Sequence, residues 1–435
     1  MRILWLSHLI PFPPRGGNLQ RSFNLIREVA KSHEVSLAAL NVNGENPARL
    51  SEYTRELKKY CREVEIWDPP YPWKGMRWQM ELLRSAALGA PFSCRARYSP
   101  ELGRKWEETL ARHRGALVHV DAIDLALFVP ATDGFHRVLN HHNCESVLAF
   151  RRAETEANPI KKAYLRLEAG KLARWERALL ERFDVNTAVC EQDRQRLLAI
   201  NPAAHIHVVE NGVDTQYFRP GGTPEQPWSV IYTASLNWAP NAAGARFFAK
   251  EVWPLVKCRC PEATLHIAGR EPPQDILQLG HAGSDIAVFP NPDDMRPLVA
   301  RASVYVCPIR EGAGTRLKIL DAMAMGKAVV STGIGCEGLR VRPERDVLVA
   351  DAPEEMADSV CRLLTDQGQR ERLGQAGREL VEREYAWEHI GCQLEEAYLC
   401  ASGAARCAAR SAEGRKLGDR FVAARVAGGI GAQSR

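Results

Sequence analysis

Several motifs and segments are missing from this 435-residue chain, and each absence counts against a class of protein. The sequence contains no H-E-x-x-H, no G-x-S-x-G and no Walker-type phosphate loop. It has no D-x-D pair placed to hold a divalent metal ion. No run approaches the roughly 18 apolar residues that a membrane-spanning helix needs. These absences disfavour zinc proteases, serine hydrolases, P-loop enzymes and membrane-spanning proteins.

Strong charge and clustered cysteine are also lacking. The net charge of +5 is mild and gives no argument for nucleic acid as a partner. The twelve cysteines are scattered, and Cys258 and Cys260 have no second pair or histidine at zinc-ligand spacing. Scattered thiols are typical of a reducing cytosol. The short apolar start ends in prolines, unlike a signal peptide. We therefore expect a cytoplasmic protein.

The chain does contain a regular alternation of strand-like and helix-like segments. Such alternation predicts parallel sheets with helices on both faces, and the length suits two domains of about 200 residues each. The expected order is an α/β domain over 1–200, a second over 201–385, a closing helix over 386–400 and a disordered tail over 401–435. Both domains are predicted to be Rossmann-like, with doubly wound sheets that face each other across a ligand-binding cleft.

One segment of the second half carries most of the chemistry. It predicts, in order, a strand at 304–309, a glycine loop at 311–314, a helix at 316–325 and a strand at 328–332. Glycines allow a ligand to approach the backbone, and helix N-termini attract anions. Arg316 and Lys318 lie in the first helical turn, where acidic residues are usually preferred. A bound diphosphate would supply the missing negative charge.

Two other interpretations of this segment are weaker. The glycines could form a plain turn whose basic neighbours are solvated. Alternatively, Gly312 and Gly314 could begin a dinucleotide-binding G-x-G-x-x-G sequence. In that case Leu317 replaces the third glycine, and the next strand lacks the expected acid at its end.

The first half contributes two candidate segments. Gly16 and Gly17 follow the first strand and precede a helix that carries Arg21, so this loop could touch a donor phosphate or an acceptor. A plain turn after the prolines is the alternative. His141 and His142 end another strand at the expected cleft, although a histidine at a strand end is often structural.

The region 149–182 is rich in Arg and Lys and is predicted to be largely helical. Glutamates are interspersed among these cations, so a solvated and ion-paired surface is the simpler interpretation. The functional alternative is contact with anionic lipid headgroups.

A family resemblance connects these pieces. The run from Gly312 to Lys327, GAGTRLKILDAMAMGK, resembles the donor-site motif of the family 4 (group 1) glycosyltransferases, in particular the subgroup with G-x-G-x-x-x-K-I-L-E-A-M-A. The resemblance covers roughly residues 1–399 and implies the GT-B fold. Further matching pieces, in the expected order, are Pro14–Gly17, His142–Glu145, Asn211–Asp214 with Phe218, and Tyr385–Glu388.

The resemblance implies roles for the residues of the donor segment. Arg316 and Lys318 would hold the donor diphosphate and stabilise the charge that develops as the glycosidic bond breaks. The backbone around Gly312, Gly314 and Thr315 would assist in binding the donor.

Three further residues have implied roles, two of them with departures from the family pattern. Asp321 resembles the second acid of the family's E-x7-E motif, which binds the nucleotide ribose, but glutamate is usual at this position. Glu311 lies ten residues before it rather than eight and would contact donor-sugar hydroxyls if its role survives. His142 would contact the transferred sugar near the reaction centre.

The resulting hypothesis is a cytoplasmic, retaining and metal-independent hexosyltransferase without a cofactor. It would move sugar from a nucleotide-sugar to a glycan or lipid-linked acceptor, in polysaccharide or glycoconjugate biosynthesis, with peripheral contact to an anionic membrane. Two alternatives stay open: a nucleotide-sugar epimerase of the GT-B fold and a non-catalytic sugar-nucleotide-binding protein.

Overall fold

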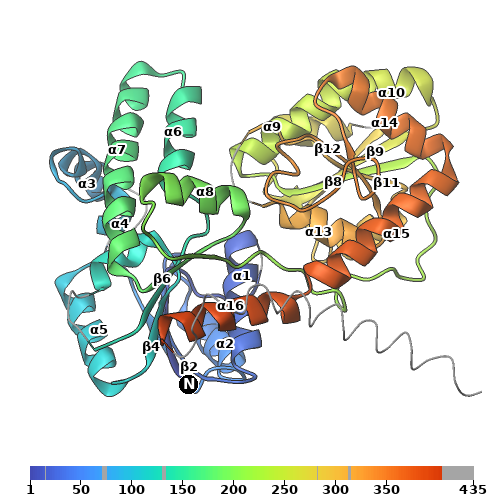
Figure 1. Ribbon diagram of the computed structural model, residues 1–435. Coiled ribbons are helices and arrows are strands. Elements are labelled where there is room, and N and C mark those ends of the chain that lie inside the picture. Colours follow the sequence, from blue (N-terminus) through green and yellow to red (C-terminus); the bar gives the residue numbers. More distant parts are fainter. Residues whose placement is uncertain (15, 71–75, 130–133, 282, 312–314, 404–435) are drawn as a thin grey trace, which may run out of the picture.

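The computed structural model describes residues 1–403 apart from 15, 71–75, 130–133, 282 and 312–314. The expectations for Gly312, Gly314 and the tail from residue 404 onward therefore lie outside the described residues. The described chain forms two α/β bodies, one from each half of the sequence (Figure 1).

The first body is built on a parallel sheet in the order β3-β2-β1-β4-β5-β6-β7. Its central strand β1 is buried on both faces, with Trp5 and Leu6 at 0% exposure, as expected for a sheet covered by helices on both sides. The strands are β1 (Arg2–Ser7), β2 (Glu34–Leu40), β3 (Glu63–Trp67), β4 (Leu117–Val120), β5 (Arg137–Asn140), β6 (Val185–Ala188) and β7 (Ile206–Val208).

The second body has a parallel sheet in the order β10-β9-β8-β11-β12-β13. Val230, Val304 and Val330 lie on neighbouring strands of this sheet and share one apolar core with the helices that cover that face. The strands are β8 (Ser229–Ser235), β9 (Thr264–Arg270), β10 (Ile286–Pro290), β11 (Val304–Cys307), β12 (Ala328–Ser331) and β13 (Leu348–Val349).

Three helices of the first body begin at a residue whose side chain caps the helix. Asn46, Ser99 and Asn158 each precede a proline, and their side chains accept hydrogen bonds from backbone amides of the first turn. The helices are α1 (Gly17–Val29), α2 (Pro47–Leu57), α3 (Met76–Ala87), α4 (Phe92–Arg97), α5 (Pro100–Arg112), the 3-10 helix η1 (Ile123–Phe128), α6 (Glu145–Thr155), α7 (Pro159–Arg182) and α8 (Glu191–Ile200).

The helices of the second body follow the same strand–helix alternation. A π-helical turn, η2 (Phe248–Val252), joins α9 (Ala239–Phe247) to α10 (Trp253–Arg259). The remaining helices are α11 (Gln274–Leu277), the 3-10 helix η3 (Gln278–Gly280), α12 (Arg296–Arg301), α13 (Leu317–Ala324), α14 (Pro353–Thr365) and α15 (Gln367–Glu384).

The chain passes between the two bodies twice, and the two crossings lie side by side. The Val213 amide donates to the Tyr385 carbonyl at 2.7 Å. A Cβ on Gly212 would lie 2.7 Å from the Trp387 ring, so this close approach requires glycine. After the second crossing, α16 (Trp387–Ala401) returns to the first body, where Trp387 and Leu394 are buried in its core beside α1.

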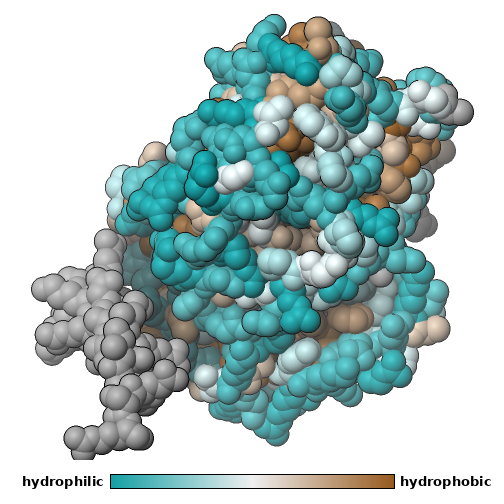
Figure 2. Space-filling model, turned by 90° about the vertical axis from the view of Figure 1, so that its right-hand side faces the viewer, coloured by the Kyte–Doolittle hydropathy of each residue, from teal (hydrophilic) through white to brown (hydrophobic). Residues whose placement is uncertain are grey.

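The predicted fold class, two doubly wound parallel-sheet domains, is confirmed. The segment predicted as helix 316–325 forms α13, which begins one residue later, so that Arg316 stands at its N-cap. The sequence analysis missed α2, α3, α4 and α5, which fill the region between β2 and β4. Among the described helices, none is long and apolar enough to cross a membrane. Viewed from the second-domain side, the molecular surface is mostly hydrophilic (Figure 2).

Candidate active site

The donor segment predicted from the sequence lies at the carboxyl edge of the second sheet. β11 ends at Cys307, and the chain then passes through Glu311 to Arg316 and into α13. Arg316 Nη2 donates to the Glu311 carbonyl at 3.4 Å, while the Glu311 side chain is exposed. Parallel strands place ligand-binding loops at this edge, so the position fits a binding site.

Lys318 is held in place by a neutral partner. Its Nζ donates to Asn241 Oδ1 at 2.8 Å and lies 5.2 Å from the centre of the Tyr232 ring. Asn241 Nδ2 donates to the Ser235 carbonyl at 2.8 Å, which turns the amide oxygen toward the lysine. Burial lowers the pKa of Lys318 to about 8, because these neighbours do not neutralise its charge.

Burial also disfavours the charged form of the acid in this segment. Asp321 is half-buried one turn after Lys318, and burial raises its pKa to about 8 although Lys318 acts in the opposite direction. Burial also lowers the pKa of Arg316 from its ordinary value. The charged forms of all three groups are disfavoured in this structure. The negative charge of a bound diphosphate would stabilise the charged forms of the two cations.

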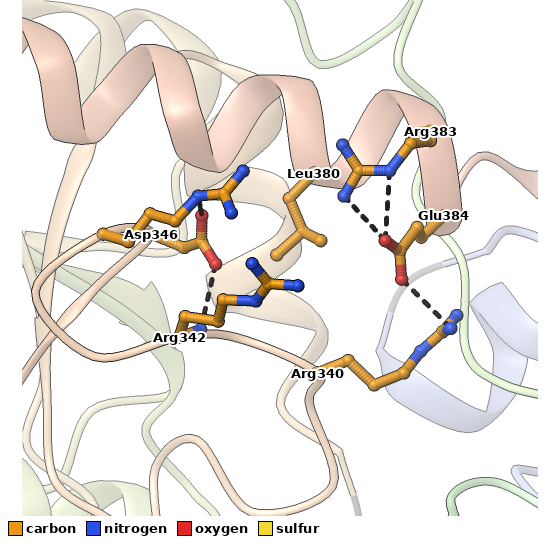
Figure 3. A pocket seen from close by; sticks show the side chains of 7 residues that line it. Arg340, Arg342, Asp346, Leu380, Arg383 and Glu384 are labelled. Atoms are coloured by element: carbon orange, nitrogen blue, oxygen red, sulfur yellow. Dashed lines mark hydrogen bonds and ion pairs between the residues drawn. The ribbon is translucent and has the colours of Figure 1, made fainter. Parts of the chain in front are cut away.

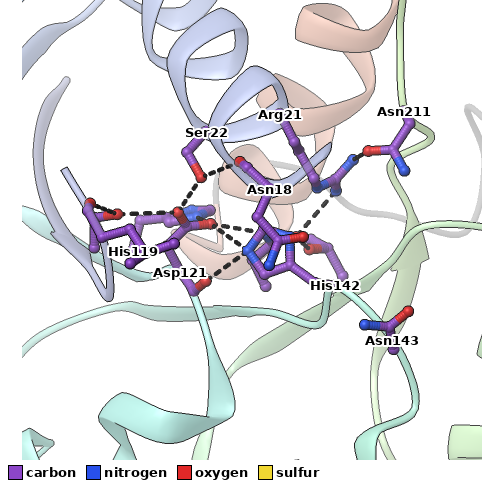
Figure 4. Close-up of polar contacts among 12 residues, drawn as sticks. Asn18, Arg21, Ser22, His119, Asp121, His142, Asn143 and Asn211 are labelled. Carbon is purple, nitrogen blue, oxygen red and sulfur yellow. Dashed lines mark hydrogen bonds and ion pairs between the residues drawn. The ribbon is translucent and has the colours of Figure 1, made fainter. Parts of the chain in front are cut away.

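The first domain presents a polar cluster at the carboxyl edge of its own sheet, centred on Asp121 after β4 (Figure 4). Ser22 Oγ donates to Asp121 Oδ2, and Asn140 Nδ2 donates to Oδ1 at 2.7 Å. His142 Nε2 lies 2.8 Å from the Asp121 carbonyl and 3.3 Å from Oδ1. Burial opposes ionisation of Asp121, yet His142 and His119 hold its pKa well below the ordinary value.

A chain of hydrogen bonds joins this cluster to the donor segment. Arg21, only 1% exposed, donates to Asn140 Oδ1 at 3.0 Å and to Asn211 Oδ1 at 3.1 Å. Asn211 Nδ2 in turn donates to Thr315 Oγ1. The path Asp121–Asn140–Arg21–Asn211–Thr315 therefore connects the two domains through buried or half-buried groups. Figure 4 shows its link from Arg21 to Asn211.

The structure thus brings together most of the residues that the sequence singled out. Thr315 and Arg21 are linked through Asn211. Gly16 has a φ of 103° at the N-cap of α1, and a Cβ on Gly17 would lie 3.6 Å from Leu317 at the start of α13. The glycine loop therefore faces the donor helix. Whether these residues bind donor or acceptor stays a prediction.

Three groups of the first domain could together hold a metal ion. The ligand atoms of His8, Asp121 and His142 lie within 4.8 Å of one another. However, the Asp121 carbonyl can only accept, so His142 Nε2 must carry the proton in their contact. A protonated nitrogen cannot ligate a metal ion. In this arrangement His142 Nε2 is engaged by the Asp121 carbonyl, and the three groups do not fit a metal site.

Ion pairs also tie the two domains together at the edge of the site. Glu337 of the second domain pairs with Arg196 at 2.5 Å and with Arg151 at 3.5 Å, both from the first domain. Burial opposes ionisation of Glu337, but the two arginines lower its pKa. The Arg152 guanidinium also lies 5.7 Å from the centre of the Trp238 ring, across the domain boundary.

A separate cavity of about 380 Å³ lies on the second domain, lined mainly by arginines and acids (Figure 3). Arg340 pairs with Glu210 at 2.6 Å and with Glu384 at 3.0 Å, and its backbone amide donates to the Tyr385 hydroxyl at 2.7 Å. These contacts attach the second domain to both crossings. The arrangement supports a structural role at the domain junction.

Two residues of the site were missed by the sequence analysis. Asn241 orients Lys318, and Asp121 organises the cluster around His142. For Asn241 a signal was available, since the Ala-Pro-Asn sequence that ends at Asn241 opens the helix after the first strand of the second domain. Asp121 follows β4 at the same edge as His142, but the order of strands had to be known first.

Comparison with known proteins assigns this arrangement to a family. A model described as Glycosyltransferase Family 4 matches residues 16–217, and one described as Glycosyl transferases group 1 matches residues 228–366. Together these matches cover the larger part of both domains. The chain belongs to the family 4, group 1 glycosyltransferases.

Individual relatives of this family 4 chain are distant. A GDP-mannose-dependent alpha-(1-6)-phosphatidylinositol monomannoside mannosyltransferase of Mycobacterium tuberculosis is 28% identical over 246 residues, or 51% of the chain and 63% of the relative. An alpha-maltose-1-phosphate synthase of the same species is 28% identical over 249 residues, or 49% of the chain and 63% of the relative. The aligned regions span less than two thirds of the length of either relative.

Solved structures show the same architecture across nearly the whole chain. Sucrose-phosphate synthase from Thermosynechococcus elongatus superimposes with a TM-score of 0.71 at 17% identity, covering 93% of this chain and 100% of that one. Anabaena HepE in complex with UDP-glucose gives a TM-score of 0.62 at 14% identity, covering 92% and 99%. The expected GT-B fold is thereby confirmed.

Proposed function

We propose that this chain is a retaining glycosyltransferase that moves a hexose from a nucleoside-diphosphate sugar to a glycan or lipid-linked acceptor. The observation that carries the proposal is the state of Lys318, a charged group whose polar partner is the Asn241 amide oxygen. A lysine cation whose polar partner is neutral can bind an anionic ligand. The relatives named for GDP-mannose and the solved complex with UDP-glucose support a hexosyl donor.

Each residue of the site has a role in this proposal. Arg316 and Lys318 bind the diphosphate and stabilise it as it leaves, which lowers the barrier more than it stabilises the ground state. Asp321 contacts the ribose, and Glu311 contacts the donor sugar. His142, oriented by Asp121, contacts the transferred sugar from the first domain. The acceptor enters from the same side.

No metal ion or cofactor takes part in the proposed reaction. The two cations perform the charge neutralisation that a divalent metal ion would otherwise supply. Transfer should therefore persist after chelation of divalent ions. Complete loss of transfer that is restored by adding one metal ion would contradict this part of the proposal.

Thermal unfolding in the presence of nucleoside diphosphates and their sugars tests the donor site. A ligand that binds the native state must raise the unfolding temperature. We expect a rise for at least one nucleotide, and loss of that rise in Lys318→Ala. Lys327→Ala is the matched control, because Lys327 is a half-buried lysine whose Nζ donates to the carbonyls of Ala300 and Ala302.

Product analysis then separates the proposal from its alternatives. Incubation with donor and a panel of glycan and lipid-linked acceptors should give a glycoside with the anomeric configuration of the donor. Formation of an epimeric sugar from donor alone would instead identify an epimerase. Nucleotide binding with no product across the panel would identify a non-catalytic binding protein.

A further inference from the structure

Trp238 presents an exposed aromatic ring where the two domains meet. Among the side chains that the structure describes, it is the one exposed tryptophan, at 47%. It stands at the N-cap of α9, and its carbonyl accepts from the backbone amide of Asn241 at 3.0 Å. The Asn241 side chain in turn holds Lys318. The ring therefore belongs to the same turn as the partner of the donor-site lysine.

The first domain approaches this ring through α6. The Arg152 guanidinium of that helix lies 5.7 Å from the ring centre. Arg152 is exposed and, within the described chain, has no carboxylate at ion-pair distance. In Figure 1, α6 stands on the side of α7 that is turned toward α9. Arg152 thus keeps hydrogen-bond donors for a ligand that lies beside the ring.

Glu145, the first residue of α6, is a half-buried carboxyl with one polar side-chain partner among the described residues. That partner is Asn143, whose Nδ2 donates to Oε1 at 3.1 Å. The backbone amide of Glu145 donates to Glu176 Oε1 of α7 at 2.8 Å, which fixes its position. Burial raises the pKa of Glu145 to about 7; Asp124 and Glu176 act in the same direction, and Arg152 opposes them. The carboxyl retains free acceptor positions.

Glu145 and Arg152 lie on one face of α6, because seven residues are close to two full helical turns. They are separated by about 10 Å along the helix axis. Arg152 lowers the pKa of Glu145 and also lies within cation–π reach of Trp238, so it connects the carboxyl to the ring. These three side chains form a continuous surface, called the α6–Trp238 surface below, that is longer than a single sugar ring.

A neutral glycan matches the chemistry of the α6–Trp238 surface. The C–H groups on one face of a sugar ring pack against an aromatic ring, whose face is negative. The hydroxyls at the edge of the sugar donate to a carboxylate and accept from a guanidinium. Ligand sites commonly combine aromatic surface with a few placed polar groups. An anionic group beside Glu145 would instead be repelled by this carboxylate and by Asp124, whose pKa is lowered.

We propose that the α6–Trp238 surface is an acceptor subsite for a neutral glycan of at least two sugars, with the terminal sugar on Glu145 and the next one stacked on Trp238. His142, proposed to contact the transferred sugar, lies three residues before Glu145, so the terminal sugar is held near the reaction centre. That this glycan is the acceptor rests on the proposed glycosyltransferase function, whereas the binding of a glycan does not.

Two residues outside this surface provide matched controls. Tyr217 is also 47% exposed, and an arginine, Arg296, lies 3.7 Å from its ring centre. That arginine comes from α12 of the second domain, not from α6. Glu156 is a half-buried glutamate at the other end of α6, where it pairs with Lys161.

Saturation-transfer NMR titrations of the full chain test the proposal. The probes are neutral disaccharides of glucose, mannose and galactose, and the same disaccharides carrying a phosphate. We expect at least one neutral disaccharide to bind, and its phosphorylated form to bind more weakly. Trp238→Ala should weaken this binding about tenfold, the effect of losing one aromatic contact. Trp238→Tyr should keep most of the affinity, and Tyr217→Ala should leave it unchanged.

Glu145→Gln tests the other end of the surface. It should weaken disaccharide binding about fivefold, because a carboxylate is the stronger acceptor for hydroxyls. The pKa of Glu145 is about 7, so its ionised fraction rises between pH 6 and pH 8 and binding to the unmodified chain should strengthen over this range. Glu145→Gln should remove that pH dependence, and Glu156→Gln should preserve it.

The rise in unfolding temperature with nucleotide reports on the donor site separately and should persist in Trp238→Ala and Glu145→Gln. Unchanged disaccharide affinity in both variants would overturn the subsite, as would tighter binding of the phosphorylated probes. Nucleotide binding without binding of any neutral disaccharide would overturn the subsite and leave the donor site intact. Disaccharide binding that both variants weaken, in a chain that binds no nucleotide, would support the subsite and contradict the proposed function.

Discussion

The carboxyl edges of the two sheets hold charged groups in opposite electrostatic conditions. In the first domain, Asp121 is fully buried, yet its neighbours hold its pKa well below the ordinary value. In the second domain, burial lowers the pKa of Lys318 and raises that of Asp321, each to about 8. Partners stabilise the charge of Asp121 at the first edge, whereas burial destabilises the charges of Lys318 and Asp321 at the second.

This difference distinguishes a structural cluster at the first edge from a candidate binding site at the second, although both edges belong to parallel sheets. Ser22, Asn140 and His142 complete the hydrogen bonds of Asp121, so that cluster needs no ligand to be stable. Lys318 has an amide oxygen and an aromatic ring instead of a carboxylate. Groups kept in unfavourable charge states are frequent at functional sites. The comparison predicts that matched substitutions at the two edges will have different consequences.

The same substitution at the two aspartates should change stability in opposite directions. Asp121→Asn removes a charge that its neighbours stabilise and leaves donors without an acceptor, which should lower the free energy of unfolding by about 3 kcal/mol. At pH 7 Asp321, whose pKa burial raises to about 8, is mostly protonated in the folded state and ionised in the unfolded state, so Asp321→Asn removes the cost of taking up that proton and should raise the free energy of unfolding by at least about 1 kcal/mol. Urea unfolding at pH 7 measures both. Equal losses in the two variants would refute the contrast.

Substitution of the donor-site cation should affect catalysis and leave the fold intact. Lys318→Ala should lower kcat/KM about 100- to 1,000-fold, the usual effect of removing a group that stabilises charge in the transition state. The free energy of unfolding of this variant should not fall, because burial disfavours the charged form of Lys318 in the folded state. Steady-state kinetics beside Lys327→Ala measures the effect. A Lys318→Ala enzyme with near-normal kcat/KM would remove this residue from the proposed site.

Sequence patterns predicted the parts of this molecule that are contiguous along the chain. The region 149–182, predicted to be largely helical, is occupied by the end of α6 and by α7, whose start is marked by Asn158 and Pro159. Arg316 and Lys318 were identified because their neighbours in sequence are also their neighbours in space. The α3–α5 region was missed, although Ser99 caps α5 in the same way as Asn158 caps α7.

Contacts between distant segments could not be predicted in this way. Arg21 was identified as a residue of the glycine loop, but its bonds to Asn140 and Asn211 depend on how the strands are ordered and how the domains meet. The partnership of Lys318 with Asn241 likewise joins two segments from different strand–helix units. The sequence therefore located the charges of the site, while the structure was needed to tell which of them are compensated.

The two edges should also respond to pH with opposite slopes. Burial lowers the pKa of His141, beside the first cluster, to about 4 from 6.5, so its contribution to stability is complete above pH 6.5 and is lost toward pH 4. The pKa of Asp321 is raised from 3.8, so its contribution is lost as pH rises toward 8. His141→Gln should weaken the acid-side slope by up to about 1.4 kcal/mol per pH unit.

Unfolding curves between pH 4 and pH 8 check both assignments. Asp321→Asn should remove a loss of stability that extends over the whole range from pH 4 to pH 8, whereas His141→Gln should change the slope only between pH 4 and pH 6.5 and leave it unchanged above pH 6.5. An acid-side slope that His141→Gln leaves intact would show that other groups control it.

The smallest expected effect concerns the residue that links the two edges. Asn211 accepts from Arg21 and donates to Thr315, so Thr315→Val keeps the first bond and loses the second. We expect about a fivefold rise in the donor KM with little change in stability, because one hydrogen bond contributes about 1 kcal/mol. Asn211→Leu removes both bonds and should also lower the free energy of unfolding, since the buried Arg21 then loses one of its three acceptors. If Thr315→Val leaves the donor KM unchanged while Asn211→Leu only destabilises, the link is structural and the first cluster does not position the donor segment.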